Sequence, residues 1–282
     1  MRDGEGSSTA LGVSVIRTVH QIVDDSPHIL EDPVSQLLLD VDRVEQIRRG
    51  SERFNSIEAR GLRSHVVLRS RYAEDELLEA AERGVRQFIS LGAGYDTFPY
   101  RQPEWATKLQ ILEFDHPATQ KDKRAHFAAK GLKDPDNLAF VPTDLEADTL
   151  RADIANAPID LQKPIWISCL GVFAYLRRQT IHRIFETIIG LPKGSGIVFA
   201  FAPDKGLISG IAGVHTSAED RAEELGEPWL TRFTVEDLST ELEGYGFTEV
   251  SFLDPDEAES KYYRNRTDLP APRIARLCKA VV

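Results

Sequence analysis

The chain has 282 residues, of which 41% are hydrophobic and 28% are charged, and it carries a net charge of −11 with a pI of about 5.2. This composition is ordinary for a soluble globular protein with a sizeable core. It argues against a nucleic-acid-binding surface, which needs clustered Lys and Arg side chains to neutralise phosphates. We therefore expect no nucleic-acid partner.

The sequence gives no signal for a membrane, a secretory pathway or a metal site. The first residues lack the apolar core of a signal peptide, and no stretch reaches the ~18 apolar residues of a membrane span. The two cysteines, Cys169 and Cys278, lie in apolar runs, and no Cys/His spacing is that of a zinc site. We expect a cytoplasmic protein with buried free thiols, no membrane association and no metal.

Residues 1–84 are predicted to form a helical cap or lid. Apolar residues recur at helical spacing over residues 11–39, with breaks before Pro27 and Pro33. Because proline biases the residue before it away from the helix, this stretch favours two or three short helices. A longer helical stretch spans residues 51–84, and the glycine that closes it is typical of a helix end.

From residue 85 onward, short apolar strands alternate with amphipathic helices. The predicted strands are 86–91, 108–115, 138–142, 164–173, 195–202, 247–253 and 276–282. The predicted helices between them are 117–131, 177–190 and 234–244. Such alternation indicates βαβ units and a sheet covered on both faces. The fold class is therefore predicted as α/β, a doubly wound, mostly parallel seven-stranded sheet over residues 85–282.

A glycine-rich turn follows the first predicted strand. Gly92 and Gly94 flank Ala93 at the strand end, where doubly wound folds bind ligands and where glycine lets backbone N–H groups approach them closely. Glycine is also common in such turns for structural reasons alone. The third glycine of the dinucleotide fingerprint is replaced by Thr97, and Pro99 leaves no helix N-terminus for a pyrophosphate. A nicotinamide cofactor is therefore disfavoured.

Acidic residues follow each of the first three predicted strands. Asp96 lies in the glycine turn, Glu113 and Asp115 end the second strand, and Asp144 follows the third. A carboxylate about twenty residues after the glycines can accept both hydroxyls of a ribose, and either acid of the second strand could do so. Because Asp96 would repel a phosphate, the acids suit a nucleoside without one. S-adenosyl-L-methionine, which carries an adenosine, an amino group, a carboxylate and a sulfonium, fits this pattern.

The glycine turn GAGYDTFPYR, together with EFDHPATQ after it, resembles the leucine carboxyl methyltransferase family of S-adenosylmethionine-dependent enzymes. Further motifs follow in the family's order along nearly the whole chain, namely STALGVSVIRTVHQIVDD, LRSRYAEDELL, PTDLEAD, LGVFAYL and GEPWLTRFTVEDL. The family includes an enzyme that methylates the C-terminal leucine of a phosphatase and polyketide O-methyltransferases. The resemblance implies a Rossmann-like methyltransferase fold of the polyketide O-methyltransferase-like bacterial branch.

The resemblance also implies roles for residues of the glycine turn and of the two strands beside it. Gly92, Ala93 and Gly94 would line the methionine part of the cofactor, and Asp96 would fix the loop. Asp115, with His116 beside it, would hold the ribose hydroxyls, and Glu113 is the less favoured alternative.

Further family positions extend the implied cofactor site. Asp144 and Leu145 would meet the adenine. Arg69 matches an arginine that binds the cofactor carboxylate, with a solvated helix-face cation as the alternative, and Arg17 matches a second basic position.

One motif departs from the family pattern. Many relatives read E-G-V-L-x-Y-L after the fourth strand, and their glutamate contacts the cofactor or the reacting group. This chain has Leu170 in its place, which would still meet the cofactor but makes methylation of a phosphatase tail less favoured. The chain keeps Tyr175, which we expect to close the pocket.

No general base is evident from the sequence. His116, His215 and Tyr175 are weak candidates, and an ordinary surface or capping role is the alternative for each histidine. Trp229 and the pair Tyr262-Tyr263 are predicted to form an apolar wall for the acceptor, or else to belong to the core.

We therefore predict an O-methyltransferase that acts on a hydroxyl or carboxyl group of a small molecule, such as a polyketide or another secondary metabolite, and releases S-adenosyl-L-homocysteine. The alternatives are a protein C-terminal carboxyl methyltransferase, a binding protein without catalysis, and a nicotinamide-dependent oxidoreductase. We expect the chain to be a monomer or a homodimer.

Overall fold

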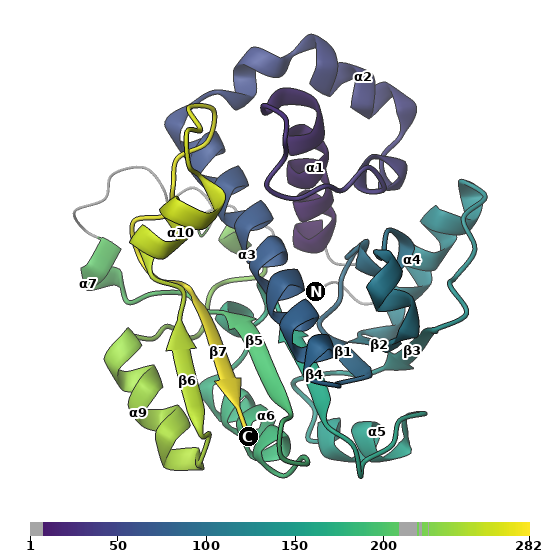
Figure 1. Ribbon diagram of the computed structural model, residues 1–282. Coiled ribbons are helices and arrows are strands. Elements are labelled where there is room, and N and C mark those ends of the chain that lie inside the picture. Colours follow the sequence, from purple (N-terminus) through teal and green to yellow (C-terminus); the bar gives the residue numbers. More distant parts are fainter. Residues whose placement is uncertain (1–7, 209–218, 220–221, 225) are drawn as a thin grey trace.

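The computed structural model describes residues 8–208, 219, 222–224 and 226–282. Its core is one seven-stranded sheet in the order β3-β2-β1-β4-β5-β7-β6 (Figure 1). The strands are β1 Gln87–Leu91, β2 Gln110–Asp115, β3 Leu138–Pro142, β4 Ile165–Cys169, β5 Gly196–Ala200, β6 Glu249–Phe252 and β7 Leu277–Val281. All pair in parallel except β7, which runs antiparallel to both β5 and β6. The predicted fold class is confirmed.

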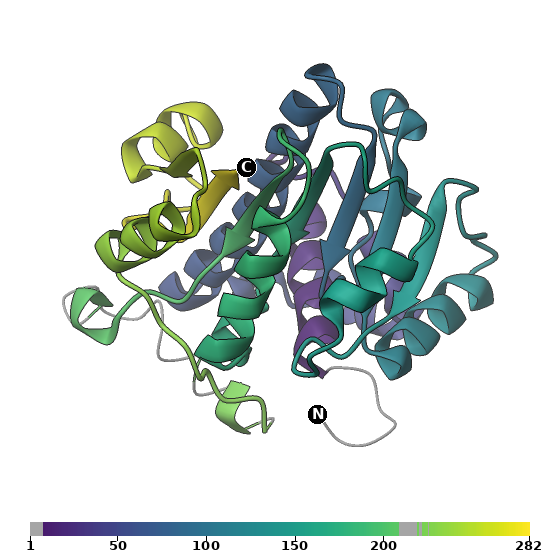
Figure 2. The same cartoon turned by 90° about the horizontal axis from the view of Figure 1, so that it is seen from below.

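The central strands are the most deeply buried, because helices cover both faces of the sheet there. All five residues of β1, β4 and β5 are buried. Figure 2 shows α5 and α6 on one side of the sheet, with α1 and α3 on the other. The helices of the first side are α5 Leu150–Asn156, α6 Arg178–Ile189 and α9 Val235–Tyr245. Those of the second side are α3 Ile57–Glu82, α4 Pro117–Ala129 and α10 Pro255–Tyr262.

The cap is made of α1 Ser8–Val23 and α2 Val41–Arg49, with the short 3-10 helices η1 Ser35–Leu38 and η2 Ser51–Phe54. In Figure 1 it lies above the sheet and rests on α3. A small apolar cluster of its own contains Val19, Leu39, Val44 and Ile47. Helix α3, in contrast, shares a core cluster with the sheet, in which Val67 packs with Ile111 and Trp166. The predicted boundary at residue 84 thus falls after a helix that forms one layer of the fold.

Helices α3 and α9 each begin at a capping side chain. Ser56 caps α3 by accepting a hydrogen bond from Ala59 N at 3.2 Å, and Thr234 caps α9 in the same way from Asp237 N at 3.0 Å. The predicted end of α9 at Gly244 is wrong. The helix continues to Tyr245, and Gly246 ends it with a φ of +99°, the left-handed conformation that favours glycine.

Both cysteines are buried and free, as predicted. In the described part of the chain, no helix is long and apolar enough to cross a bilayer.

Candidate active site

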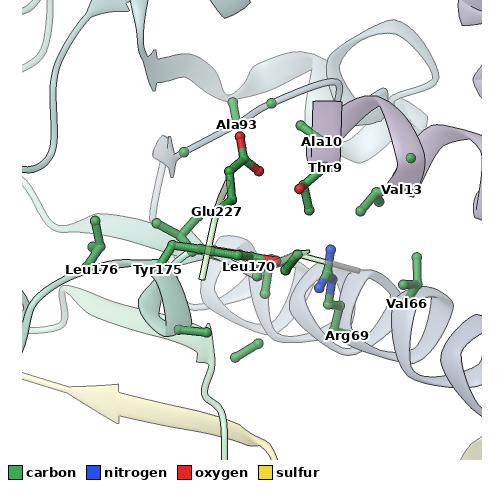
Figure 3. Close-up of a pocket in the computed structure, with 18 of the residues that line it drawn as sticks. Thr9, Ala10, Val13, Val66, Arg69, Ala93, Leu170, Tyr175, Leu176 and Glu227 are labelled. Carbon is green, nitrogen blue, oxygen red and sulfur yellow. The ribbon is translucent and has the colours of Figure 1, made fainter. Parts of the chain in front are cut away.

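A cavity of about 990 Å³ opens at the carboxyl ends of the central strands. It lies where the strand order reverses, since β1 is followed by β2 and β3 on one side and by β4 and β5 on the other. Residues from the turns after β1, β2 and β4 line it, and α1 and α3 add a further wall (Figure 3). The volume is at the upper end of the range for ligand pockets, roughly 300–1,000 Å³.

The glycine turn lines the cavity with bare backbone. Gly92 has a φ of +65°, and a Cβ atom there would lie 2.4 Å from Val172 Cγ2. Gly94 has a φ of +52°, and its Cβ would lie 3.1 Å from Ala10 Cβ in α1. Side chains at these positions would be strained; one at Gly92 would collide with the turn after β4, and one at Gly94 would crowd the cap. The glycines therefore allow three segments to meet around the cavity.

Asp115 is the acid of β2 that lines the cavity. Its Oδ1 accepts a hydrogen bond from His116 N at 2.6 Å, and its Oδ2 accepts one from Gly94 N, so the carboxylate is held against the glycine turn. Burial raises the pKa of Asp115, although these backbone bonds oppose the shift.

Glu113, the alternative acid of β2, lies away from the cavity. Both of its carboxylate oxygens are 2.7 Å from Lys123 Nζ of α4, and neither side chain reaches solvent. Burial raises the pKa of Glu113 to about 7, against the opposing charge of Lys123. Its role is structural, because it neutralises a buried lysine between the sheet and α4.

Asp96 and Arg17 join the glycine turn to the cap. Arg17 of α1 donates to Asp96 Oδ1 at 2.8 Å and to Ser70 Oγ of α3 at 2.7 Å. Asp96 Oδ1 also accepts from Thr97 N at 2.8 Å. The expected loop-fixing position of Asp96 agrees with these contacts. Arg17 lines the cavity, but its guanidinium donates hydrogen bonds to Asp96, Ser70 and Thr97 of the protein itself.

The cap contributes a second buried acid to this junction. Asp32 lies just before one of the prolines that break the predicted cap helices, and its side chain is fully buried. Its Oδ2 accepts from Thr97 Oγ1 at 2.7 Å, and its Oδ1 accepts from Ser35 N at 3.0 Å. The cap and the glycine turn are therefore held together by polar contacts at two points.

Arg69 points into the cavity from α3 (Figure 3). Its buried Nε has no hydrogen-bond partner among the described residues. Burial, reinforced by the nearby positive charge of Arg17, lowers the pKa of Arg69 to about 10. A buried cation with an unmatched polar atom is costly unless an anion reaches it. Arg69 thus fits the carboxylate of an amino-acid group.

Gly171 makes room for Arg69. It follows β4 with a φ of +70°, and a Cβ there would lie only 2.4 Å from Arg69 Nη1. Any side chain at this position would displace the guanidinium group.

Three other expected cofactor residues also line the cavity. Asp144 and Leu145 follow β3, and Leu170 follows β4. Asp144 Oδ1 accepts a hydrogen bond from Glu146 N at 3.0 Å, which fixes this carboxylate at the adenine end that the sequence predicts.

The candidate bases differ in their surroundings. His116 caps α4, because its Nδ1 accepts from Ala118 N at 3.2 Å. An imidazole that accepts at Nδ1 carries its proton on Nε2, so this geometry argues against a role as base. Tyr175 lines the cavity, and burial raises its pKa, which makes its phenolate scarce. His215 lies outside the described residues.

The predicted aromatic wall is only half correct. Trp229 lines the cavity, whereas Tyr262 and Tyr263 do not. Tyr262 donates to Asp75 Oδ2 at 2.8 Å, and the Tyr263 hydroxyl lies 2.7 Å from Ser64 Oγ. Tyr263 belongs to the core cluster between α3 and α10, and the partly buried Tyr262 packs against this cluster.

The polar residues of the cavity that sequence reasoning missed include His65, Glu227 and Arg276. His65 lies one helical turn before Arg69, so their four-residue spacing on α3 was a usable signal. No comparable signal exists for Glu227 and Arg276, which reach the cavity from a loop and from the residue before β7.

The sheet order, the glycine turn and the acid at the end of β2 are those of the S-adenosylmethionine-dependent methyltransferases. The chain belongs to the leucine carboxyl methyltransferase family, whose model matches residues 10–189. The predicted family and cofactor are therefore confirmed.

Individual relatives agree with this membership. The chain is 29% identical over 292 residues to YktD of Bacillus subtilis, assigned as an S-adenosyl-L-methionine-dependent methyltransferase, with 95% of each chain covered. A Mycobacterium marinum protein with the same assignment is 30% identical over 62% of this chain and 54% of its own length.

Solved structures share the fold at low sequence identity. A Thermobifida fusca protein assigned as a methyltransferase has a TM-score of 0.59 at 16% identity and covers 99% of this chain, with 96% of its own chain matched. A Streptomyces avermitilis protein of the DUF574 family has a TM-score of 0.55 at 16% identity, with 94% and 95% covered.

Proposed function

We propose that this methyltransferase methylates an oxygen atom, in a hydroxyl or carboxyl group, of a small and largely apolar molecule. The observation that carries the proposal is the second half of the cavity, which extends beyond the glycine turn between the cap and the end of β5. Its walls are mainly apolar and include Val13, Ile16, Leu62, Val66, Phe201 and Leu230. Such a lining favours an acceptor with an aromatic or alkyl body.

The polar half of the cavity suits the cofactor. In this proposal Arg69 binds the methionine carboxylate, Asp115 accepts from the ribose hydroxyls, and Asp144 accepts from the adenine amine while Leu145 packs on the ring. Arg17 supports the glycine turn through Asp96 instead of binding the cofactor directly. The cofactor supplies an electrophilic methyl group: the acceptor oxygen bonds to the methyl carbon while sulfur keeps the electron pair of the broken bond.

The residues around the acceptor have two tasks. The apolar walls exclude water and align the oxygen with the methyl group, which accounts for much of the acceleration in such transfers. A carboxylate acceptor carries no proton to remove. For a hydroxyl acceptor we assign the removal of the hydroxyl proton to His65, which lines the cavity on the same helix as Arg69. Histidine is the side chain most often used for such a transfer near neutral pH.

The test is transfer of a labelled methyl group from S-adenosylmethionine to two panels of acceptors. One panel contains hydroxylated and carboxylated aromatics and polyketides, and the other contains peptides that end in leucine. Product from the first panel supports the proposal. Product from the peptides alone would indicate a protein carboxyl methyltransferase. No product from either panel, with S-adenosylhomocysteine still bound, would favour a binding protein without catalysis.

A further inference from the structure

Helix α1, which runs from Ser8 to Val23, contains a single glycine, Gly12, in its interior. Apart from proline, glycine is the least favourable residue in a helix interior, because it loses the most conformational freedom on folding. A glycine in this place needs a reason. Three reasons are available: a backbone conformation that other residues avoid, a close neighbour that leaves no room for a side chain, or space for a bound molecule.

The first two reasons do not apply to Gly12. Its φ is not positive, unlike those of the glycines in the turns. A Cβ atom added at this position would meet no atom of the described residues within 4 Å. Gly171 shows the contrast, because a Cβ there would lie only 2.4 Å from Arg69 Nη1. Neither the backbone of α1 nor the packing of the cap on α3 therefore requires a glycine at position 12.

The open space beside Gly12 is the cavity. Gly12 is half-buried and lines this cavity together with Val13 and Ile16 of the same helix. Figure 3 shows Val13 of α1 and Val66 of α3 on opposite sides of the space. Between branched apolar side chains, Gly12 leaves a recess whose floor is bare backbone. Such a recess allows a bound molecule to approach the helix closely.

The recess lies on the side of α1 that faces away from the glycine turn. Arg17 donates to Asp96 of that turn at 2.8 Å, and Ala10 lies directly against it. Because successive residues of an α-helix are about 100° apart around the axis, Gly12 lies on the same side as Ile16 and roughly opposite Ala10. Gly12 therefore borders the acceptor half of the cavity, which Ile16 also lines.

We propose that Gly12 sets the size of the methyl acceptor, whose body is a planar system of two or more fused rings that lies against the bare backbone of α1. The inference deepens the proposed function and rests on it. A single ring would leave the recess unfilled and would lose the contacts that its walls offer. A side chain at position 12 narrows the acceptor half without disturbing α1, since the helix itself has room for one.

The experiment measures methyl transfer to probes of graded size. The hydroxyl probes are phenol, 2-naphthol and 2-anthrol, and the carboxyl probes are benzoate, 2-naphthoate and anthracene-2-carboxylate. The unchanged protein should give a higher kcat/KM with the larger probes of each series. Gly12→Leu should lower kcat/KM for the three-ring probes at least tenfold, mainly through KM, because it overfills the recess. The one-ring probes should stay within about twofold.

Two further measurements separate this effect from damage to the fold or to the cofactor site. Gly12→Ala should raise the melting temperature by about 1–3 °C, because alanine favours the helix. Titration calorimetry uses S-adenosylhomocysteine and 5′-methylthioadenosine, which lacks the amino-acid end. Gly12→Leu should bind both ligands within about twofold of the unchanged protein.

Gly244→Leu is the matched control. Gly244 also lies inside a helix, α9, and an added Cβ would meet no described atom within 4 Å. Unlike Gly12, it is exposed to solvent and lies outside the cavity lining. Gly244→Leu should therefore leave the order of the probes and their kcat/KM values unchanged.

Several outcomes would overturn the inference. They are the same order of ring sizes in Gly12→Leu as in the unchanged protein, a preference of the unchanged protein for one-ring probes, and a lower melting temperature of Gly12→Ala. Weaker binding of S-adenosylhomocysteine alone would place Gly12 at the methionine end instead. If the unchanged protein bound S-adenosylhomocysteine but methylated no probe, the proposed function itself would fail, and the inference with it.

Discussion

At the scale of single residues, Asp115 links the glycine turn to the proposed ribose contact. Its carboxylate already accepts from Gly94 N and His116 N. We expect Asp115→Ala to weaken the binding of both S-adenosylhomocysteine and 5′-methylthioadenosine at least tenfold. The reason is the loss of hydrogen bonds to a charged group, which contribute ~1.5–3 kcal/mol. Titration calorimetry measures this.

Glu113→Gln is the control for Asp115. It should lower stability, because it leaves the buried Lys123 without its counter-charge, but it should not change the affinity of the folded protein. An unaltered affinity of Asp115→Ala would remove Asp115 from the ribose contact.

Asp96 makes stability depend on pH. Burial alone would raise its pKa, but the charges of Arg17 and Arg101 outweigh burial and hold the pKa at about 2. A pKa lowered on folding stabilises the native state above the unfolded value, near 4, and this contribution is lost as the pH falls through about 2. Asp96→Asn should therefore cost at most about 2 kcal/mol at pH 7.

Urea unfolding at pH 7 and pH 3 tests this expectation. The difference between Asp96→Asn and the unchanged protein should shrink at pH 3. Asp136→Asn, at an exposed turn position, should show no difference at either pH. If the two proteins differed in unfolding free energy by the same amount at both pH values, the hydrogen-bond geometry of Asp96 would matter and its charge would not.

At the scale of elements, the turn after β4 is fitted to α3. Because a Cβ at position 171 would overlap the Arg69 guanidinium, Gly171→Ala should weaken the binding of S-adenosylhomocysteine about tenfold. Binding of 5′-methylthioadenosine, which needs no arginine, should persist. Calorimetry with both ligands gives the comparison.

Gly244→Ala is the matched change for this prediction. Its added Cβ meets no atom within 4 Å, and it lies inside α9. It should leave binding intact and should be neutral or stabilising, since alanine favours the helix by up to about 1 kcal/mol. If Gly171→Ala bound both ligands normally, Arg69 would have another way to reach the cofactor.

The elements differ in how well the sequence predicts them. The seven strands were predictable because each is a short apolar run between turn signals, and α6 was predictable from its apolar face. Helix α5 has only seven residues, too few to show a helical period. Asp115 was predictable from its distance to the glycines. Glu227 was not, because its approach to the cavity depends on how a loop packs against the turn after β4.

At the scale of the whole molecule, the cap and the sheet are joined through α3. Val67, Leu77 and Ala80 of this helix are at most 1% exposed. A truncated chain of residues 85–282 would expose the sheet face beneath them, so it should show no cooperative unfolding. A chain of residues 56–282 retains α3 and should melt cooperatively, but at a lower temperature than the full chain.

Thermal unfolding followed by far-ultraviolet circular dichroism distinguishes these chains. The full chain should unfold in a single transition. Cooperative unfolding of residues 85–282 alone would show that the predicted boundary at residue 84 separates two independent units.

The position of Trp229 gives the protein a built-in optical reporter. The chain has three tryptophans, of which only Trp229 lines the cavity. Trp166 is buried in the core, and Trp105 packs against Phe98 with 6.2 Å between their ring centroids. A molecule that enters the acceptor half changes the surroundings of this indole and leaves the other two as a constant background. Unlabelled compounds could therefore be screened by the change in intrinsic emission, with Trp229→Phe as the blank.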